Sequence, residues 1–252
     1  MILRIRRLAL CLIALTTLGS PSAQAGCDDP PARRVNWLRC DKQGIDLRGA
    51  DLREAVLGRV NFAGANLSEA RLSGADLGRA DLTETNFSGA RMTDVRMVGA
   101  KLRGAILVGA SMAGARLDRG DLTGADLNWA DMSRARLYEA QLADSSLEGT
   151  DLSNAYLVQA DLTDANLAGA LLSGATLSRA SLEGADLRGA DIRGAMLDES
   201  NLLGADFSAA NLAKADLRNA RINNANFTGA RLGSTIWVNR KRCHPDSVTE
   251  CR

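Results

Sequence analysis

Large apolar residues recur at every fifth position from Leu47 to Leu232, and a small residue usually stands two places before each of them. The central residue is leucine in 28 of the 38 consecutive units, and the small residue is alanine in 30. On an α-helix five residues advance by about 500°, so the leucines would form no stripe. On a flat strand an odd period sends alternate leucines to opposite faces. The pattern therefore predicts a chain that turns one corner per unit and closes a four-cornered coil every 20 residues, with the central residues on a common axis.

The repeated run Ala-Asp-Leu-x-x, seen at residues 75–79 and 185–189, resembles the pentapeptide repeat family. The similarity covers residues 45–234 and implies an all-β fold, a right-handed quadrilateral parallel β-helix of about nine and a half coils. Coils stacked about 4.8 Å apart would form a solid rod without a pore. Residues 20 apart should then lie over one another, for example Met92 over Met112 and Phe207 over Phe227.

Residues 1–25 have the features of a secretory signal peptide. Arg4, Arg6 and Arg7 precede an apolar stretch at 8–18, and small residues before Gly26 predict cleavage after Ala25. The apolar stretch is short for a membrane span. We therefore expect a periplasmic or secreted protein whose mature chain has no transmembrane segment. A retained N-terminal anchor and a lipoprotein attached at Cys27 are the alternatives.

Four cysteines flank the repeats, two on each side. A disulfide requires Cα atoms within about 7 Å of each other, and the two ends of the predicted rod are much farther apart. The predicted pairs are therefore Cys27–Cys40 and Cys243–Cys251, within an N-terminal cap at 26–44 and a C-terminal cap at 235–252. The same distance argument excludes a zinc site made from all four cysteines.

Charge and composition argue against several classes of function. Without residues 1–25 the chain has 28 basic and 30 acidic residues, a net charge of −2, which does not favour direct binding of DNA or RNA. Some relatives protect DNA gyrase by imitating duplex DNA with a strongly negative rod; that role is kept as an alternative. His244 is the only histidine, and a filled rod has no cleft for catalysis. We therefore expect no enzymatic activity and no cofactor. We also expect no metal site, because the stacked carboxylates of Asp131 and Asp151 are interpreted as part of a solvated ladder of polar side chains.

Function is expected on the sides of the rod. One side should stack Arg96, Arg116 and Arg136, with Arg119, Tyr138 and Tyr156 nearby, and stacked like charges indicate an anionic partner. A mixed, solvated wall is the competing interpretation, because acidic residues share that side. The predicted function is a non-enzymatic exported scaffold or protein-interaction module, whose partner is a protein or an envelope component. An envelope-binding or glycan-binding module is a further alternative, and the protein could form a homodimer.

Overall fold

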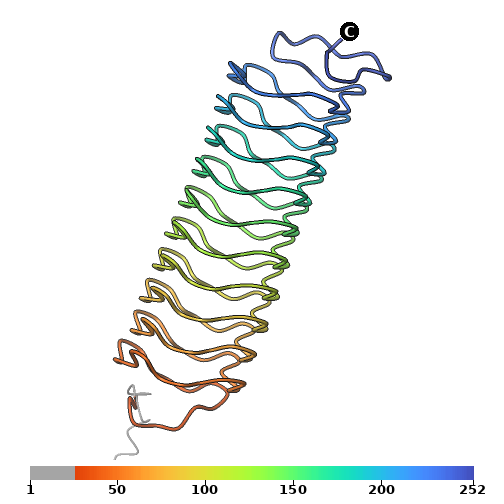
Figure 1. Cartoon of the computed structure of the whole chain (residues 1–252). Helices are drawn as coiled ribbons and strands as arrows, with labels where there is room; N and C mark the ends of the chain where they lie inside the picture. Colours follow the sequence, from red (N-terminus) through yellow and green to blue (C-terminus); the bar gives the residue numbers. More distant parts are fainter. Residues whose placement is uncertain (1–25) are drawn as a thin grey trace, which may run out of the picture.

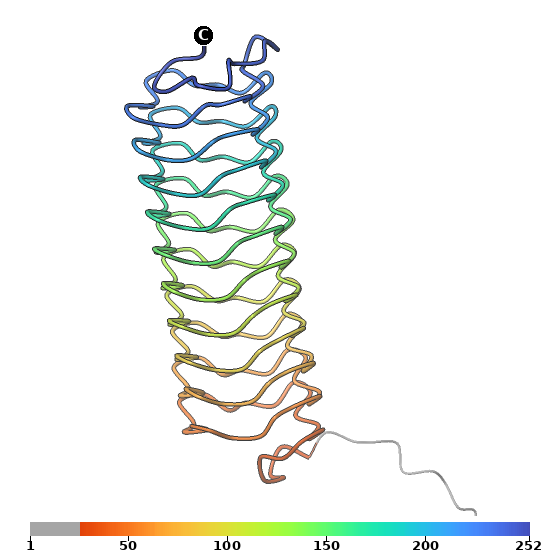
Figure 2. The same ribbon diagram turned by 90° about the vertical axis from the view of Figure 1, so that its right-hand side faces the viewer.

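The computed structural model describes residues 26–252, which form one rod with successive coils stacked in chain order (Figure 1). The predicted signal peptide, residues 1–25, lies outside the described residues. Within 26–252 no helix has the length and apolar character needed to cross a membrane. The described chain begins at one end of the rod and finishes at the other (Figures 1 and 2).

The coil is held together by pairs of residues that lie 20 apart in the sequence. Parallel single-residue β-bridges run from Asn36 with Val56 to Asp216 with Ile236, one in every five-residue unit. Between the bridges the chain makes a two-residue turn in each unit, and residues 26–252 contain no helix and no longer strand. A bridge every five residues and a repeat every 20 give the coil four sides.

The unit at 126–130 shows how five residues make one side of the coil. Asp126 in the first position forms the bridge, Leu127 in the second points to the axis, Asn128 and Trp129 make the turn, and Ala130 in the fifth points inward. The φ of Trp129 in the fourth position is +60°, and the amide of Ala130 donates to the carbonyl of Leu127. A positive φ at this position is the signature of a type II turn, which explains why glycine is frequent there.

The backbone donors of that unit also explain the aspartate in the first position. Four of its five amides, those of Asp126, Leu127, Trp129 and Ala130, donate to backbone carbonyls at 2.7–3.0 Å. The fifth amide, that of Asn128, donates to Oδ1 of Asp126 at 3.1 Å. Aspartate and asparagine commonly close such a turn with their own side chain. Where the first residue has no acceptor, the third-position amide is left without this partner.

The axis is filled by the second-position and fifth-position side chains, as the sequence predicts. Leu127 is fully buried, and so are the stacked residues Met92 and Met112. Phe207 and Phe227 are stacked with ring centroids 5.1 Å apart and planes inclined by 3°, which confirms the predicted column. Thr150, in the alanine position, is also buried, and its hydroxyl donates to a backbone carbonyl at 2.8 Å.

The repeat register continues into the N-terminal flank. Trp37 and Lys42 occupy second positions, and Trp37 is fully buried, with its indole N–H donating to the carbonyl of Asp29 at 3.2 Å. The ammonium of Lys42 lies 4.6 Å from the Trp37 ring. The Cys27–Cys40 disulfide, with Cα atoms 5.4 Å apart, ties the preceding segment across this end. The flank therefore covers the axis with an aromatic ring and a cation.

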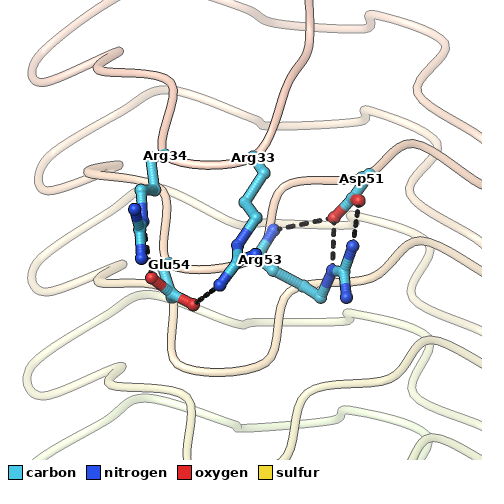
Figure 3. A network of polar contacts seen from close by, with 5 residues as sticks. All are labelled: Arg33, Arg34, Asp51, Arg53 and Glu54. Carbon is cyan, nitrogen blue, oxygen red and sulfur yellow. Dashed lines mark hydrogen bonds and ion pairs between the residues drawn. The ribbon is translucent and has the colours of Figure 1, made fainter.

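A network of polar contacts attaches the same flank to the next coil. Arg33 and Arg34 both bind the carboxylate of Glu54, and Arg53 binds Asp51 with its Nε 2.7 Å from Oδ1 (Figure 3). The hydrogen bond from Arg53 lowers the pKa of Asp51 to about 2. Hydrogen bonds from Arg33 and then Arg34 lower the pKa of Glu54. These residues were not identified from the sequence, although Arg34 lies 20 residues before Glu54 and therefore one coil away in the same column.

At the C-terminal end the chain reverses direction. Ile236 pairs with Arg242 in an antiparallel bridge, and Trp237 packs edge-on against Phe227 at 5.2 Å. Cys243 and Cys251 form a disulfide with Cα atoms 4.8 Å apart. Both predicted disulfides are therefore confirmed.

Candidate interaction surface

The side of the coil with the predicted arginine column is called the arginine face. It consists of residues 56–60, 76–80 and so on at intervals of 20 to 236–240, and it begins in the first coil with 36–40. Its first-position residues Arg96, Arg116, Arg136 and Tyr156 are joined by consecutive bridges and are all exposed. The sequence-based grouping of these residues thus corresponds to one continuous surface.

Two of the proposed contact residues belong to a cluster with an internal counter-charge. Nε of Arg119 lies 2.6 Å from Oε2 of Glu139, and the Arg119 guanidinium is 5.8 Å from the ring centroid of Tyr138. The hydrogen bond from Arg119, and then that from Tyr138, lowers the pKa of Glu139. Hydrogen bonding to Glu139 in turn raises the pKa of Tyr138. Arg119 and Tyr138 are therefore held in place by an acid from the same face.

Arg136 and Tyr156 form a second pair in this cluster. The Arg136 guanidinium lies 5.8 Å from the Tyr156 ring centroid, and its Nε is 3.5 Å from Oδ1 of Asp118. The two tyrosine rings lie 6.3 Å apart, which joins the two pairs. Oδ1 of Asp118 is buried and accepts no hydrogen bond from residues 26–252. The middle of the arginine face thus agrees with the interpretation of a mixed wall.

The N-terminal part of the face has a different character. Arg96 and Arg116, and three further arginines in the fourth position, form no ion pair within the described chain. The three are Arg39, Arg59 and Arg79, all exposed, one in each of three successive coils. Five guanidinium groups on one side of the rod are therefore available to an external anion.

Counting charges shows that the four sides of the rod are not equivalent. From residue 56 onward the arginine face has nine basic residues against six acidic ones, whereas the opposite side, residues 46–50 to 226–230, has two against six. The nine are Arg59, Arg79, Arg96, Arg116, Arg119, Arg136, Arg179, Arg218 and Arg240. A near-neutral chain can thus have one side with a local excess of positive charge.

Backbone donors are distributed with the same asymmetry. On the opposite side nine third-position amides donate to side-chain oxygens, for example Arg48 to Asp46. On the arginine face only Leu38, Gly78 and Arg218 do so. Eight others donate no hydrogen bond within 26–252: the amides of Gly58, Val98, Asp118, Tyr138, Val158, Ser178, Asp198 and Val238. The face is rich in donors and poor in acceptors. The sequence contains this signal, since apolar, aromatic and arginine residues replace Asp or Asn in one column of 20.

Other outward residues are explained by packing. Trp129 is 66% exposed, and a Cβ added to Gly149 in the next coil would lie 2.3 Å from its ring, so the indole rests against a glycine.

No group of three or more His, Cys, Asp or Glu side chains within residues 26–252 is arranged to hold a metal ion.

Comparison with known proteins places the chain in a family. The pentapeptide repeats family matches in eight copies, over residues 43–79, 61–97, 96–134, 130–174, 165–204 and 200–236. The chain belongs to the pentapeptide repeat family, whose fold is a right-handed quadrilateral β-helix, as the sequence predicts. No curated protein matches the sequence.

Several solved structures resemble the chain. HetL, a pentapeptide repeat protein involved in heterocyst differentiation regulation in the cyanobacterium Nostoc sp. strain PCC 7120, is 33% identical with a TM-score of 0.76, over 83% of this chain and 92% of HetL. A pentapeptide repeat protein from the Arabidopsis thaliana thylakoid lumen is 32% identical over 37% of this chain and 65% of its own, with a TM-score of 0.37. QnrB1, a plasmid-mediated fluoroquinolone resistance protein, is 19% identical over 71% of this chain and 85% of its own, with a TM-score of 0.36. The likeness to HetL supports a repeat scaffold or interaction module without specifying its partner.

Proposed function

We propose that this protein is an exported, non-enzymatic interaction module that binds an acidic protein surface through its arginine face. The observation that carries the proposal is the shortage of acceptors on that face. Within residues 26–252, Arg96 and Arg116 have no counter-ion, and most third-position amides of the face have no acceptor. An acidic surface brings carboxylate oxygens, and hydrogen bonds between ionised partners are stronger than neutral ones.

Export is supported by the two disulfides and the N-terminal sequence. Disulfides form and persist in oxidising compartments, which include the periplasm and the cell exterior. The proposed organisation is a cleaved signal peptide at 1–25, caps at 26–44 and 235–252, and a repeat domain at 45–234. We retain nine and a half coils as the proposed length of that domain. The rigid sides of the rod then keep the arginines in fixed order for a partner.

The test measures binding of poly-L-glutamate to the disulfide-bonded protein by fluorescence anisotropy at low and moderate salt. Changing Arg96, Arg116 and Arg136 together to serine should weaken binding at least tenfold and leave the melting temperature almost unchanged. A matched variant changes Arg71, Arg91 and Arg221, first-position arginines on the other sides, to serine.

Because both triple variants alter the net charge equally, a purely nonspecific attraction would weaken both to the same degree. That result would overturn the assignment of function to the arginine face. Retention of the protein on purified envelope glycan, with no binding to poly-L-glutamate, would instead favour the glycan-binding alternative.

A further inference from the structure

A hollow of about 350 Å³ lies on the arginine face near the N-terminal end of the rod. Its floor is the backbone at Gly58 and Gly78, third-position residues in successive coils. Leu38 and Val98 occupy the same column one coil beyond them on either side. The complete lining is Leu38, Arg39, Gly58, Arg59, Asp76, Gly78, Arg79 and Val98.

The two glycines are not required by the fold. Glycines in the fourth position, such as Gly74, have a positive φ, whereas Gly58 and Gly78 do not. The other third-position glycine of the rod is Gly233, where a Cβ would lie 2.3 Å from the carbonyl oxygen of Pro245. A Cβ on Gly58 would lie 3.1 Å from a terminal methyl group of Leu38, which can move, and a Cβ on Gly78 would lie 3.1 Å from Oδ1 of Asp76. The corresponding bond from Thr83 to Asp81 shows that a third-position Cβ is compatible with a first-position aspartate. The effect of these two glycines is therefore the hollow itself.

Two residues of the lining, Gly58 and Val98, have a backbone amide whose usual acceptor is missing. The amide of Gly78 donates to Oδ1 of Asp76 at 3.0 Å, as in most units of the rod. The corresponding first residue for Gly58 is Val56, which has no acceptor, and the Gly58 amide makes no hydrogen bond within residues 26–252. Because the backbone repeats from unit to unit, this N–H points to the place where a carboxylate oxygen normally lies.

Positive charge and apolar surface surround that donor. Arg39, Arg59 and Arg79 form one wall, are exposed, and have no ion pair within the described part of the chain. Leu38, which is part of the lining, and Val56, which begins the unit of Gly58, are each 41% exposed and provide apolar surface near Gly58. The only acid in the lining, Asp76, already accepts the amide of Gly78. The hollow therefore combines a free N–H, three guanidinium groups and an apolar rim.

We infer that this hollow is the anchoring site for a carboxylate side chain from an extended acidic segment of the partner protein. One carboxylate oxygen accepts the Gly58 N–H in place of the missing first-position aspartate, and the guanidinium groups of Arg39 and Arg59 bind the other. A neighbouring apolar residue of the segment packs on Leu38 and Val56. The protein nature of the ligand rests on the proposed function, whereas the carboxylate chemistry rests on the hollow alone.

The experiment uses Val56→Asn, which supplies an internal acceptor for the Gly58 amide without changing the net charge. The probe is a labelled peptide in which glutamate alternates with leucine, and a glutamine version of it tests whether the carboxylates are needed. Ile106→Asn is the matched control, because Ile106 is 40% exposed and occupies a first position on the opposite side of the rod. The third-position amide of its unit, that of Val108, also donates no hydrogen bond within 26–252.

We expect Val56→Asn to weaken binding of the glutamate peptide about tenfold and Ile106→Asn to leave this binding unchanged. The glutamine peptide should bind neither the wild type nor either variant. Equal binding to wild type and Val56→Asn would overturn the anchoring site. If binding then still fell on replacing Arg96, Arg116 and Arg136, the proposed function would stand without the hollow. Loss of binding only in Val56→Asn would instead support the hollow and remove the wider face from the interface.

Discussion

Replacing Leu127 by aspartate tests the assignment of inward and outward positions directly. Leu127 lies in the middle of the rod, fully buried, with Leu107 and Leu147 in the same column one coil on either side, also fully buried. The neighbouring residue Asp126 points outward, and its Oδ1 accepts the amide of Asn128 at 3.1 Å. Two adjacent residues are thus predicted to differ strongly in how much stability a substitution removes.

The magnitude follows from burial. Truncating a buried leucine to alanine costs about 2 to 5 kcal/mol through lost transfer energy and the cavity left behind. Aspartate at position 127 would add the cost of removing a carboxylate from water, several kcal/mol more, with no cation in the column to offset it. Because whole domains are stable by only about 5 to 15 kcal/mol, Leu127→Asp should abolish cooperative folding or separate the rod into two parts.

Asp126→Ser should cost about 1 kcal/mol, the net value of one partly buried hydrogen bond. Serine already stands in this column at Ser146, one coil further on. The assay is urea denaturation followed by circular dichroism at 25 °C, with Leu127→Ala as an intermediate variant. Equal losses of unfolding free energy in Leu127→Asp and Asp126→Ser would refute the inward and outward assignment.

Two further predictions concern the surface. Gly149→Ala should lower the melting temperature more than Gly169→Ala: both sites have positive φ, but only at Gly149 would the new Cβ meet the ring of Trp129. Adding Trp129→Ala should remove the difference, and a difference that survives would contradict this explanation. Because the pKa of folded Asp51 is about 2, below its unfolded value, its bond to Arg53 stabilises the protein above about pH 4, and this contribution is lost as pH falls toward 2. Carbon-detected NMR titration should show this low pKa in the wild type and a normal one in Arg53→Ala; a normal pKa in both would exclude the bond.

The period of five was sufficient to predict the core. Because each unit makes one corner, residues such as Leu127 had to point inward and residues such as Asp126 outward, whatever their detailed contacts. The same period predicted the 20-residue coil and hence the columns, and the resemblance to the pentapeptide repeat family implied that the coil is a right-handed parallel β-helix. The rod geometry that follows separated the ends and so selected the disulfides Cys27–Cys40 and Cys243–Cys251, both of which are present.

The contacts of long side chains could not be obtained in this way. The sequence placed Arg96, Arg116, Arg119 and Arg136 on one side, but only the tertiary structure distinguishes Arg119, paired with Glu139, from Arg96, which has no partner within the described chain. An arginine can reach acids in its own unit or in an adjacent coil, so its column does not determine its partner.

The sequence by itself determined which residues fill the axis of this protein, because a buried position tolerates only apolar or small side chains and the period repeats without a gap. The tertiary structure decided which guanidinium groups remain available on the arginine face, because their pairing depends on which acids the adjacent coils place within reach. Val56, two residues before Gly58, offers its amide no acceptor, and stacking adds Arg39 of the preceding coil to the same hollow as Gly58 and Arg59. Such a site exists only when the coils are assembled.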